Sequence, residues 1–551
     1  MSLLLVGMQS VMNVRQGLDE QYYNQLTREA ADAGVQHLER CINKSFETDI
    51  PLDTTITYRP NTNCDGTAST THTEHLLSTP QYRTTYTATI SSSDLYTYRV
   101  RVQSKVDFIR TTNNSVWKTV NYSMNADASK GLYSSSKSAI GYYQVCGVID
   151  YKTWCWGRNE DGQLGDGTTT NSLVPVRVVR DSGMLAGKAD TDVAVGRHFA
   201  CTISSNEVYC WGSNERGQLG NGSTTPSLRP VKVTQTTGLA GKQLSNIVTT
   251  EKTACVIASG DIYCWGDSRY GQLGISVGIS SYSNTSSTYY RTTPVKVSTI
   301  GASVSAGLAV TKIATTPSAR HICAIVAAGD AYCWGGNDNG QLGWRLNNYY
   351  DQYYPRLVTR STDGDLGTRI VTDIAVGGWI TDGSSQYGGN TCAVADGRVH
   401  CWGANDEGQL GIGSVLASAS GNGYTVPIAV TANGIPTTGM QQVGVGYWHS
   451  CARRASEMWC WGQNYYGELG LGFTGSRRTT PQKLPTTTNE LSGKTITDMS
   501  AGVYRVCVVA DNATYCWGNN DYGQIGDGTT VTRNTATEAY FLRSKIPSVK
   551  F

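Results

Sequence analysis

Cysteines recur in pairs along most of this 551-residue chain, and a pair of cysteines can form a disulfide or ligate a metal. Six pairs have eight intervening residues and a seventh has nine. A zinc site needs four ligands, and no second Cys or His pair recurs in register with these cysteines. His198, His321 and His449 precede the first cysteine of their repeats, but the other four repeats lack such a histidine. The spacing therefore favours seven disulfides: Cys146–Cys155, Cys201–Cys210, Cys255–Cys264, Cys323–Cys333, Cys392–Cys401, Cys451–Cys460 and Cys507–Cys516.

The segment CTISSNEVYC shows how such a pair can close. If Ser205-Asn206 is a two-residue turn, Cys201 and Cys210 lie directly opposite each other in a β-hairpin, within reach of a disulfide. The longer copy, CAIVAAGDAYC, supplies Gly329 where a three-residue loop needs a left-handed residue. Each ten-residue loop should contribute about 2–3 kcal/mol on the chain-entropy account. Disulfides in this number indicate an oxidising compartment, so we expect an extracellular protein.

The second cysteine of each pair begins a Cys-Trp-Gly triplet, followed by a G-[QE]-[LI]-G turn. Successive triplets are 54 to 69 residues apart, a period typical of propellers and solenoids. The intervening runs, such as VAVGRHFACTI and PVKV, are short and β-rich, and no long amphipathic helix separates them. Four strands per repeat predict a seven-bladed β-propeller. In that fold the triplet's tryptophan fills the wedge between blades and the leucine of the turn acts as a plug, which makes the repeated residues structural.

The string G-x-x-H-x-C…Y-C-W-G-x-N-x-x-G-Q-L-G-x-G-T…P-V-x-V resembles the regulator of chromosome condensation repeat over about residues 136–551. The resemblance implies a seven-bladed β-propeller. The family includes a nuclear nucleotide exchange factor that binds chromatin and a secreted bacterial β-lactamase inhibitor protein, so the fold does not fix the function. Paired cysteines and a net charge of +2 argue against a nuclear role and against nucleic acid as a partner.

The N-terminal region has a different pattern. Residues 1–14 are largely apolar and uncharged, and residues 15–42 are amphipathic, with Leu18, Tyr22 and Leu26 near helical spacing. We therefore predict one helix over 1–42, whose fourteen-residue apolar part is too short to span a bilayer. The stretch QLTREAADAGVQHLERCI, after the apolar start, resembles the N-terminal helix of type IV pilin-like proteins. The chain departs from that family because no acidic residue occurs before Asp19 and no short basic leader is present.

The pilin-like resemblance implies that the apolar half-helix packs in a filament core and that a small antiparallel sheet follows. The expected core residues are Leu3, Leu4, Leu5, Val6, Val11, Val14 and Leu18. The small β domain is expected over 43–126, with strands within 95–125 around a turn at Asn113-Asn114. Cys41 and Cys64 would pair to tie helix to sheet, 127–138 would be a linker, and the propeller would occupy 139–551. The expected fold is mainly β, with a long N-terminal α-helix, a pilin-like sheet and a propeller with one disulfide per blade.

No catalytic constellation is visible in the sequence. It contains no nucleotide P-loop, Rossmann fingerprint, HExxH motif or GxSxG elbow. His72 and His75 form a THTEH segment that is better explained as an exposed loop than as a metal site. The acidic loops RNEDGQLGDG and GNDNGQLG lack the alternating ligands of a calcium loop. We therefore expect no enzyme activity, no cofactor and no metal.

Three long inserts are rich in Tyr, Ser, Asn and Gly, a composition typical of recognition surfaces. The candidate recognition residues are Tyr282, Tyr289, Tyr290, Trp344, Tyr349, Tyr350, Tyr353, Tyr354 and Trp379. These rings would bind a ligand, contact the next subunit, or only cover the propeller. The leading hypothesis is a homopolymeric cell-surface filament, in the membrane only before assembly, whose propeller binds a host cell, glycan or surface ligand. The alternatives are a secreted or surface-anchored propeller that binds or inhibits a protein partner, and an enzyme with its site at the central opening.

Overall fold

The computed structural model describes five strands within residues 57–129 and most of the chain over residues 135–539. Within that body the described residues exclude 181–183, 236–237, 276–288, 299–308, 345–348, 359–365, 381–386, 417–422, 432–433 and 486–489. The predicted helix over 1–42, its filament-core residues, the Cys41–Cys64 pair, His72 and His75 lie outside the described residues. The chain divides between Leu132 and Tyr133 into two compact units.

The N-terminal unit contains an antiparallel sheet with the strand order β1-β3-β4-β5, and β2 pairs with β3. The strands are β1 (Thr57–Tyr58), β2 (Ser78–Thr79), β3 (Tyr82–Ser92), β4 (Thr97–Ile109) and β5 (Val116–Ser129). The strands expected within 95–125 are therefore β4 and β5, joined across the segment that holds Asn113 and Asn114.

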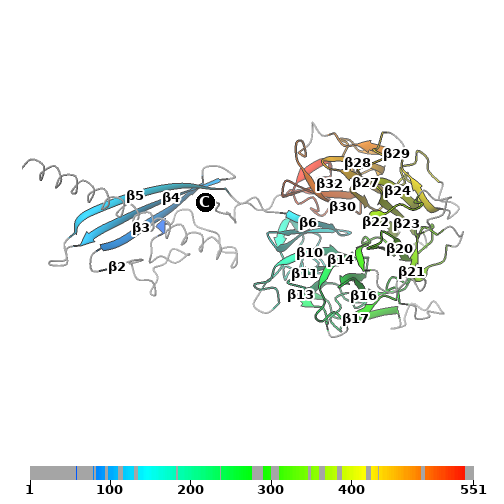
Figure 1. Cartoon of the computed structure of the whole chain (residues 1–551), viewed down its shortest axis with the longest axis horizontal. Coiled ribbons are helices and arrows are strands. Elements are labelled where there is room, and N and C mark those ends of the chain that lie inside the picture. Colours follow the sequence, from blue (N-terminus) through cyan, green and yellow to red (C-terminus); the bar gives the residue numbers. More distant parts are fainter. Residues whose placement is uncertain are drawn as a thin grey trace, which may run out of the picture. The chain divides into compact units, whose positions relative to one another are not determined.

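The second unit is a ring of seven four-stranded antiparallel sheets, each built from four consecutive strands (Figure 1). The predicted seven-bladed propeller is thus confirmed. The first strands are β6 (Ser135–Ile140), β10 (Asp190–Val195), β14 (Leu244–Thr249), β18 (Val310–Ala314), β22 (Val371–Ile380), β26 (Gln442–Val445) and β30 (Ile496–Gly502). The second strands are β7 (Gln144–Ile149), β11 (Phe199–Ser204), β15 (Thr253–Ala258), β19 (His321–Val326), β23 (Tyr387–Ala395), β27 (His449–Arg454) and β31 (Arg505–Ala510).

The third strand of each blade carries the Cys-Trp-Gly triplet and the fourth strand forms the outer edge. The third strands are β8 (Lys152–Gly157), β12 (Glu207–Gly212), β16 (Asp261–Asp267), β20 (Ala331–Gly335), β24 (Arg398–Gly403), β28 (Glu457–Asn464) and β32 (Ala513–Gly518). The fourth strands are β9 (Ser172–Arg177), β13 (Ser227–Lys232), β17 (Tyr290–Lys296), β21 (Gln352–Leu357), β25 (Tyr424–Ala429), β29 (Gly475–Lys483) and β33 (Arg533–Glu538).

All seven blade disulfides predicted from the spacing are present. In the second blade Cys201 and Cys210 lie directly opposite each other across β11 and β12, with the turn at Ser205-Asn206 as expected. Gly329 takes the left-handed conformation (φ 79°) in the longer fourth-blade hairpin. Because side chains alternate along a strand, the disulfide faces one neighbouring blade and the triplet's tryptophan faces the other.

The blades pack through apolar clusters that each combine side chains from two neighbouring sheets. The seven triplet tryptophans and the leucine or isoleucine of the G-[QE]-[LI]-G turn are completely buried. The turn must approach the next blade closely, because a Cβ on Gly165 would lie 2.7 Å from the indole of Trp211. These contacts confirm that the repeated residues build the seams between blades.

The ring closes by packing between complete blades, and none of the described strands is exchanged between blades. β33 pairs with β32 as the last strand of the seventh blade, and β6 pairs with β7 as the first strand of the first blade. Figure 1 shows β6 next to β30 and β32, and Ile140 and Trp156 share an apolar cluster with Cys507 and Ile525. From sequence alone the last strand could complete either the final blade or the first, and its pairing with the preceding strand β32 assigns it to the seventh blade.

Two predicted boundaries were wrong. The expected linker 127–138 overlaps two strands, because β5 continues to Ser129 and β6 begins at Ser135, four residues before the predicted start of the propeller. Small polar residues indicated a linker, but strand pairing with β4 and β7 includes them in sheets. Within the described residues, no helix has the length and apolar character needed to cross a bilayer.

Candidate functional site

The repeat residues that form the seams are fully used in structural contacts. Each triplet tryptophan donates its indole N–H to the main-chain carbonyl of the Gln or Glu in the preceding blade's turn, at 2.8–3.0 Å. The side chain of that Gln or Glu accepts the N–H of the residue two positions earlier. These residues are therefore committed to the seams, and the loops and the central channel are the parts of the propeller that could hold a site.

The loops that join the first strand to the second, and the third to the fourth, must emerge at the same end of the propeller because neighbouring strands are antiparallel. We call this end the loop face, and we call the opposite end, which carries the two-residue turns such as Ser205-Asn206, the turn face. Contacts between loops of adjacent blades support the assignment. His198 Nδ1 lies 2.8 Å from Asp161 Oδ2, and the guanidinium of Arg320 lies 3.9 Å from the ring of Tyr270.

All three tyrosine-rich inserts leave from the loop face. Two join the third and fourth strands of the third and fourth blades, and one lengthens the hairpin of β22 and β23. The candidate recognition residues differ in exposure: Tyr350 is 77% exposed and Tyr354 is 38% exposed, whereas Tyr289 and Trp344 are buried. Tyr290, Tyr349 and Tyr353 are half-buried, Tyr282 lies outside the described residues, and Trp379 is placed only as a backbone position in β22.

Arg356 organises the aromatic residues of the fourth-blade insert. Its guanidinium lies 4.2 Å from the ring of Trp344 and 4.5 Å from that of Tyr354. The structure thus brings these two predicted residues together through a cation that the sequence analysis did not single out.

A second group of aromatic residues on the loop face was missed. We call Tyr142, Tyr143, Tyr447, Trp448, Tyr466, Tyr504 and Tyr522 the aromatic cluster; they come from the sixth, seventh and first blades. Tyr504 links them, since its ring lies 5.1 Å from Tyr447, 6.1 Å from Trp448 and 4.8 Å from Tyr466. The T-shaped pair of Tyr142 and Tyr447 connects the first blade to the sixth across the mouth of the ring.

Two arginines border the aromatic cluster on the first and second blades. The guanidinium of Arg197 lies 4.8 Å from the ring of Tyr142, and that of Arg158 lies 4.9 Å from Tyr143. Arg197 also pairs with Glu251 at 3.3 Å, and Arg158 pairs with Glu160. Burial lowers the pKa of the neighbouring His198 from 6.5, although Asp161 acts in the opposite direction. The loop face therefore combines a cluster of rings with adjacent charges of both signs.

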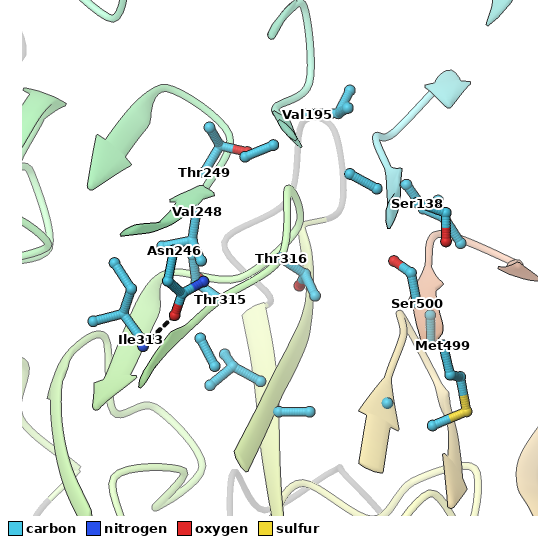
Figure 2. A pocket seen from close by; sticks show the side chains of 18 of the residues that line it. Ser138, Val195, Asn246, Val248, Thr249, Ile313, Thr315, Thr316, Met499 and Ser500 are labelled. Atoms are coloured by element: carbon cyan, nitrogen blue, oxygen red, sulfur yellow. Dashed lines mark hydrogen bonds between the residues drawn. The ribbon is translucent and has the colours of Figure 1, made fainter. Parts of the chain in front are cut away.

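The central channel contains a cavity of about 170 Å³ lined by the first strands of the blades (Figure 2). Small residues such as Ala139, Ala194, Ala314 and Ser500 line part of its wall and leave it open. At one level of the channel each blade contributes one polar or charged residue. We call this set the girdle: Lys137, Asp192, Asn246, Lys312, Asp373, Gln442 and Asp498.

The girdle links every blade to the next. Two links are the ion pairs Lys137–Asp192, at 3.8 Å, and Lys312–Asp373. In four links an oxygen of the girdle residue accepts a main-chain N–H of the next blade at 2.7–3.3 Å: Ile247 to Asp192, Ile313 to Asn246, Val443 to Asp373, and Ser138 to Asp498. In the seventh link Gln442 Nε2 donates to Asp498 Oδ1 at 3.2 Å. Figure 2 shows the link from Ile313 to Asn246.

The chemistry of the girdle is structural. The carboxylate of Asp192 raises the pKa of Lys137, and each of the three aspartates has at least one partner in a neighbouring blade. No group of three or more His, Cys, Asp or Glu side chains suited to a metal occurs among the described residues. His321 Nε2 lies 2.8 Å from Thr391 Oγ1, but both side chains are completely buried, so a substrate cannot reach this pair. The loop face, with its aromatic cluster, is therefore the candidate site.

Known proteins support the fold. Residues 152–203, 205–248, 328–381, 396–453 and 456–509 match the regulator of chromosome condensation (RCC1) repeat, and a second form of that repeat matches 191–218, 310–341 and 440–468. The ultraviolet-B receptor UVR8 of Arabidopsis thaliana is 26% identical over 383 residues, 69% of this chain and 75% of the receptor. The human E3 ubiquitin-protein ligase HERC2 is 28% identical over 386 residues, 70% of this chain but 6% of the ligase.

Solved structures give the same result for the fold alone. Human WBSCR16 superposes with a TM-score of 0.56 at 19% identity, covering 70% of this chain and 93% of that one. Yeast RCC1 (Prp20) in complex with Kap60 superposes with a TM-score of 0.55 at 21% identity, covering 75% and 86%. The body from β6 to β33 is a seven-bladed β-propeller of regulator of chromosome condensation repeats.

Proposed function

We propose that this chain is a secreted or cell-surface propeller that binds a protein partner through its loop face and performs no catalysis. The seven disulfides support a location in an oxidising compartment, where such bonds persist. Relatives built on the same repeat include a receptor and a ubiquitin ligase, and yeast RCC1 was solved bound to Kap60. The receptor and the complex of yeast RCC1 with Kap60 favour a binding role over an enzyme with its site at the central opening.

The aromatic cluster with its bordering arginines is the observation that carries the proposal. Tyrosine, tryptophan and arginine are the residues most enriched where protein interfaces concentrate their binding energy. Within the cluster Tyr466 is 38% exposed, and Tyr465, which precedes it in the chain, is 54% exposed, so part of this surface faces solvent. Tyrosine and tryptophan also present a large contact area at low cost in side-chain entropy. The charges of Arg158, Arg197 and Glu251 at the border would set the orientation of the partner.

The test compares variants on the two faces. Tyr466→Ala removes an exposed ring of the loop face, and Tyr151→Asn removes a 71% exposed ring from the two-residue turn Asp150-Tyr151 on the turn face. Proteins enriched from the extracellular fraction on the wild-type chain are purified, and their Kd values for the three chains are measured. We expect Tyr466→Ala to raise the Kd for the specific partner at least about tenfold and Tyr151→Asn to leave that Kd unchanged. Equal Kd values for all three chains would refute the loop face as the site.

A filament role is the second candidate, and the N-terminal unit supplies its one supporting observation. Three strands of 11, 13 and 14 residues form an antiparallel meander after an apolar and amphipathic segment, an order expected of a pilin-like subunit. In this reading residues 1–42 assemble into a homopolymeric core and the propeller is displayed for adhesion to a host cell, glycan or other surface. Electron microscopy of the intact chain decides between the two: ordered fibres support the filament, and dispersed particles that still bind their partner exclude it.

A further inference from the structure

One seam of the propeller contains a carboxylic acid where the other six contain an amide. The residue after the first glycine of the G-[QE]-[LI]-G turn is Glu468 in the sixth blade. It is glutamine in each of the other six blades. In each copy this side chain accepts the N–H of the residue two positions earlier, and Tyr466 N–H donates to Glu468 Oε2 at 2.8 Å. Its main-chain carbonyl accepts the indole N–H of Trp517 from the seventh blade. Glu468 therefore occupies the same seam position as the glutamines.

The second oxygen of Glu468 has no hydrogen-bond partner. Glu468 is completely buried, and Oε1 accepts no hydrogen bond among the described residues, although the main-chain N–H groups of Tyr465, Tyr466 and Glu468 itself partly oppose the rise in its pKa. A buried ionised carboxylate without a cation is strongly disfavoured, whereas a protonated carboxyl has the shape and neutrality of the glutamine side chain. Burial accordingly raises the pKa of Glu468 to about 7.

The charged and titratable groups around Glu468 do not offset its charge. Glu407, from the preceding blade, disfavours ionisation and is itself paired with Arg477 at 3.4 Å. The buried Arg505 of the next blade directs its guanidinium to the carbonyls of Gly141 and Tyr142, at the opposite seam of its own blade. Burial lowers the pKa of His449 to about 4, so this imidazole is uncharged near neutrality, and the Tyr504 phenol is uncharged as well.

Glu468 is connected to the surface through one short loop. Tyr466, whose N–H it accepts, is 38% exposed and lies against Tyr504, the residue that links the aromatic cluster. We propose that Glu468 is a proton-binding site that controls the seam between the sixth and seventh blades, so that loss of its proton loosens the loop carrying Tyr465 and Tyr466. The role of this loop in binding rests on the proposed function, but the proton switch does not need a partner to be observed.

The direction of the effect follows from linkage. The closed seam holds the proton up to about pH 7, and an opened, solvated Glu468 would hold it only to about 4.5. Opening therefore becomes more favourable as pH rises from about 4.5 to 7 and levels off above 7. With a pKa of about 7 in the closed seam and 4.5 in the opened one, the equilibrium constant for opening should increase roughly fiftyfold between pH 5.0 and pH 7.5.

The experiment is hydrogen–deuterium exchange of the full chain at pH 5.0 and 7.5, corrected for the intrinsic pH dependence of exchange. We expect amides of residues 465–469 and 503–505 to lose protection at pH 7.5 in the wild type, and Glu468→Gln to abolish that difference. Gln218→Glu is the matched control, because it places a carboxyl at the same position of a seam distant from the aromatic cluster. It should add a pH-dependent loss of protection around residues 216–219 and leave the wild-type response at 465–469 and 503–505 unchanged.

Two outcomes would overturn the switch. One is equal corrected protection of the wild type at both pH values, and the other is a pH dependence that persists in Glu468→Gln. If the switch fails while Tyr466→Ala still weakens the partner, only the proton switch is wrong. If exchange behaves as expected while Tyr466→Ala binds normally, the switch stands and the proposed binding face falls.

Discussion

The indole N–H of Trp156 in the first blade donates to the main-chain carbonyl of Gln524 in the seventh blade, at 2.8 Å. The same bond joins each of the other six pairs of neighbouring blades, at 2.9–3.0 Å. The seam that closes the ring is therefore built like the internal seams, although its two halves are more than 360 residues apart in the chain. Asp498 and Ser138 add the girdle link across that seam.

This similarity predicts the effect of breaking one seam bond. Trp156→Phe leaves the buried carbonyl of Gln524 without its donor, which should lower the free energy of unfolding by about 1–3 kcal/mol. Trp334→Phe, at an internal seam, is the matched control and should cost about the same. Both are measured by urea denaturation. A much smaller cost for Trp156→Phe would mean that the closing seam is loose in solution.

The girdle predicts a contrast between two substitutions at one position. Asp373 accepts Val443 N–H at 2.8 Å and pairs with Lys312, so Asp373→Ala removes both contacts and leaves a buried N–H unpaired. We expect a loss of about 2–3 kcal/mol in unfolding free energy for this variant. Asp373→Asn should cost less than about 1 kcal/mol, because Asn246 natively makes the same bond to Ile313. Equal losses for the two variants would contradict the role given to the accepting oxygen.

The disulfides predict slow reduction of the native protein. Cys201 and Cys210 are completely buried, as are the other blade cysteines to within 1%. Alkylation in the presence of a reductant should therefore label the blade cysteines only as fast as the propeller unfolds, which mass spectrometry can follow. The double variant Cys201→Ala/Cys210→Ala should lower the unfolding free energy by about 2–3 kcal/mol, since it frees a ten-residue loop in the unfolded chain. Rapid labelling at low temperature would show that the pairs are open.

The blade interior could be predicted from sequence because its rules are local. The two-residue period of a strand and a two-residue turn place Cys201 opposite Cys210, and the same reading places Trp211 on the face that packs against the preceding blade. Seven copies remove most of the ambiguity of a single one. The girdle was missed because each link joins residues from different repeats: Lys312 and Asp373 are 61 positions apart, and only the packing of one blade against the next brings them together.

The candidate site was harder to predict. Composition drew attention to the long inserts, of which Trp344 and Tyr289 are buried, whereas the aromatic cluster is assembled from single residues in different repeats. A signal was present in the aligned copies. In the first and sixth repeats an aromatic residue (Tyr142, Tyr447) follows the glycine that comes directly after the first strand. Tyr466 and Tyr522 both stand two positions before the Gln or Glu of the turn. Aligning repeats by column, in ring order, would have shown these residues as neighbours.

The buried histidines predict the behaviour of the propeller in acid. His321 and His449 each lie opposite the glycine of a Cys-Trp-Gly triplet and are completely buried, which lowers the pKa of His321 to about 3 and of His449 to about 4. A histidine whose pKa is lower in the folded state than in the unfolded state binds its proton more weakly when folded. The free energy of unfolding is therefore highest above pH 6.5 and decreases as pH falls from 6.5 towards 4. For His449 the loss should be about 3 kcal/mol by pH 4.

Asn390 occupies the same position in the fifth blade, which makes His449→Asn a conservative test. This variant cannot take up a proton on unfolding, so its unfolding free energy should fall less steeply between pH 6.5 and pH 4 than that of the wild type. Urea denaturation at half-unit steps of pH measures the two slopes. Above pH 7 the curves should run parallel, because neither side chain titrates there. Identical slopes below pH 6.5 would show that His449 is hydrated and protonates within the folded propeller.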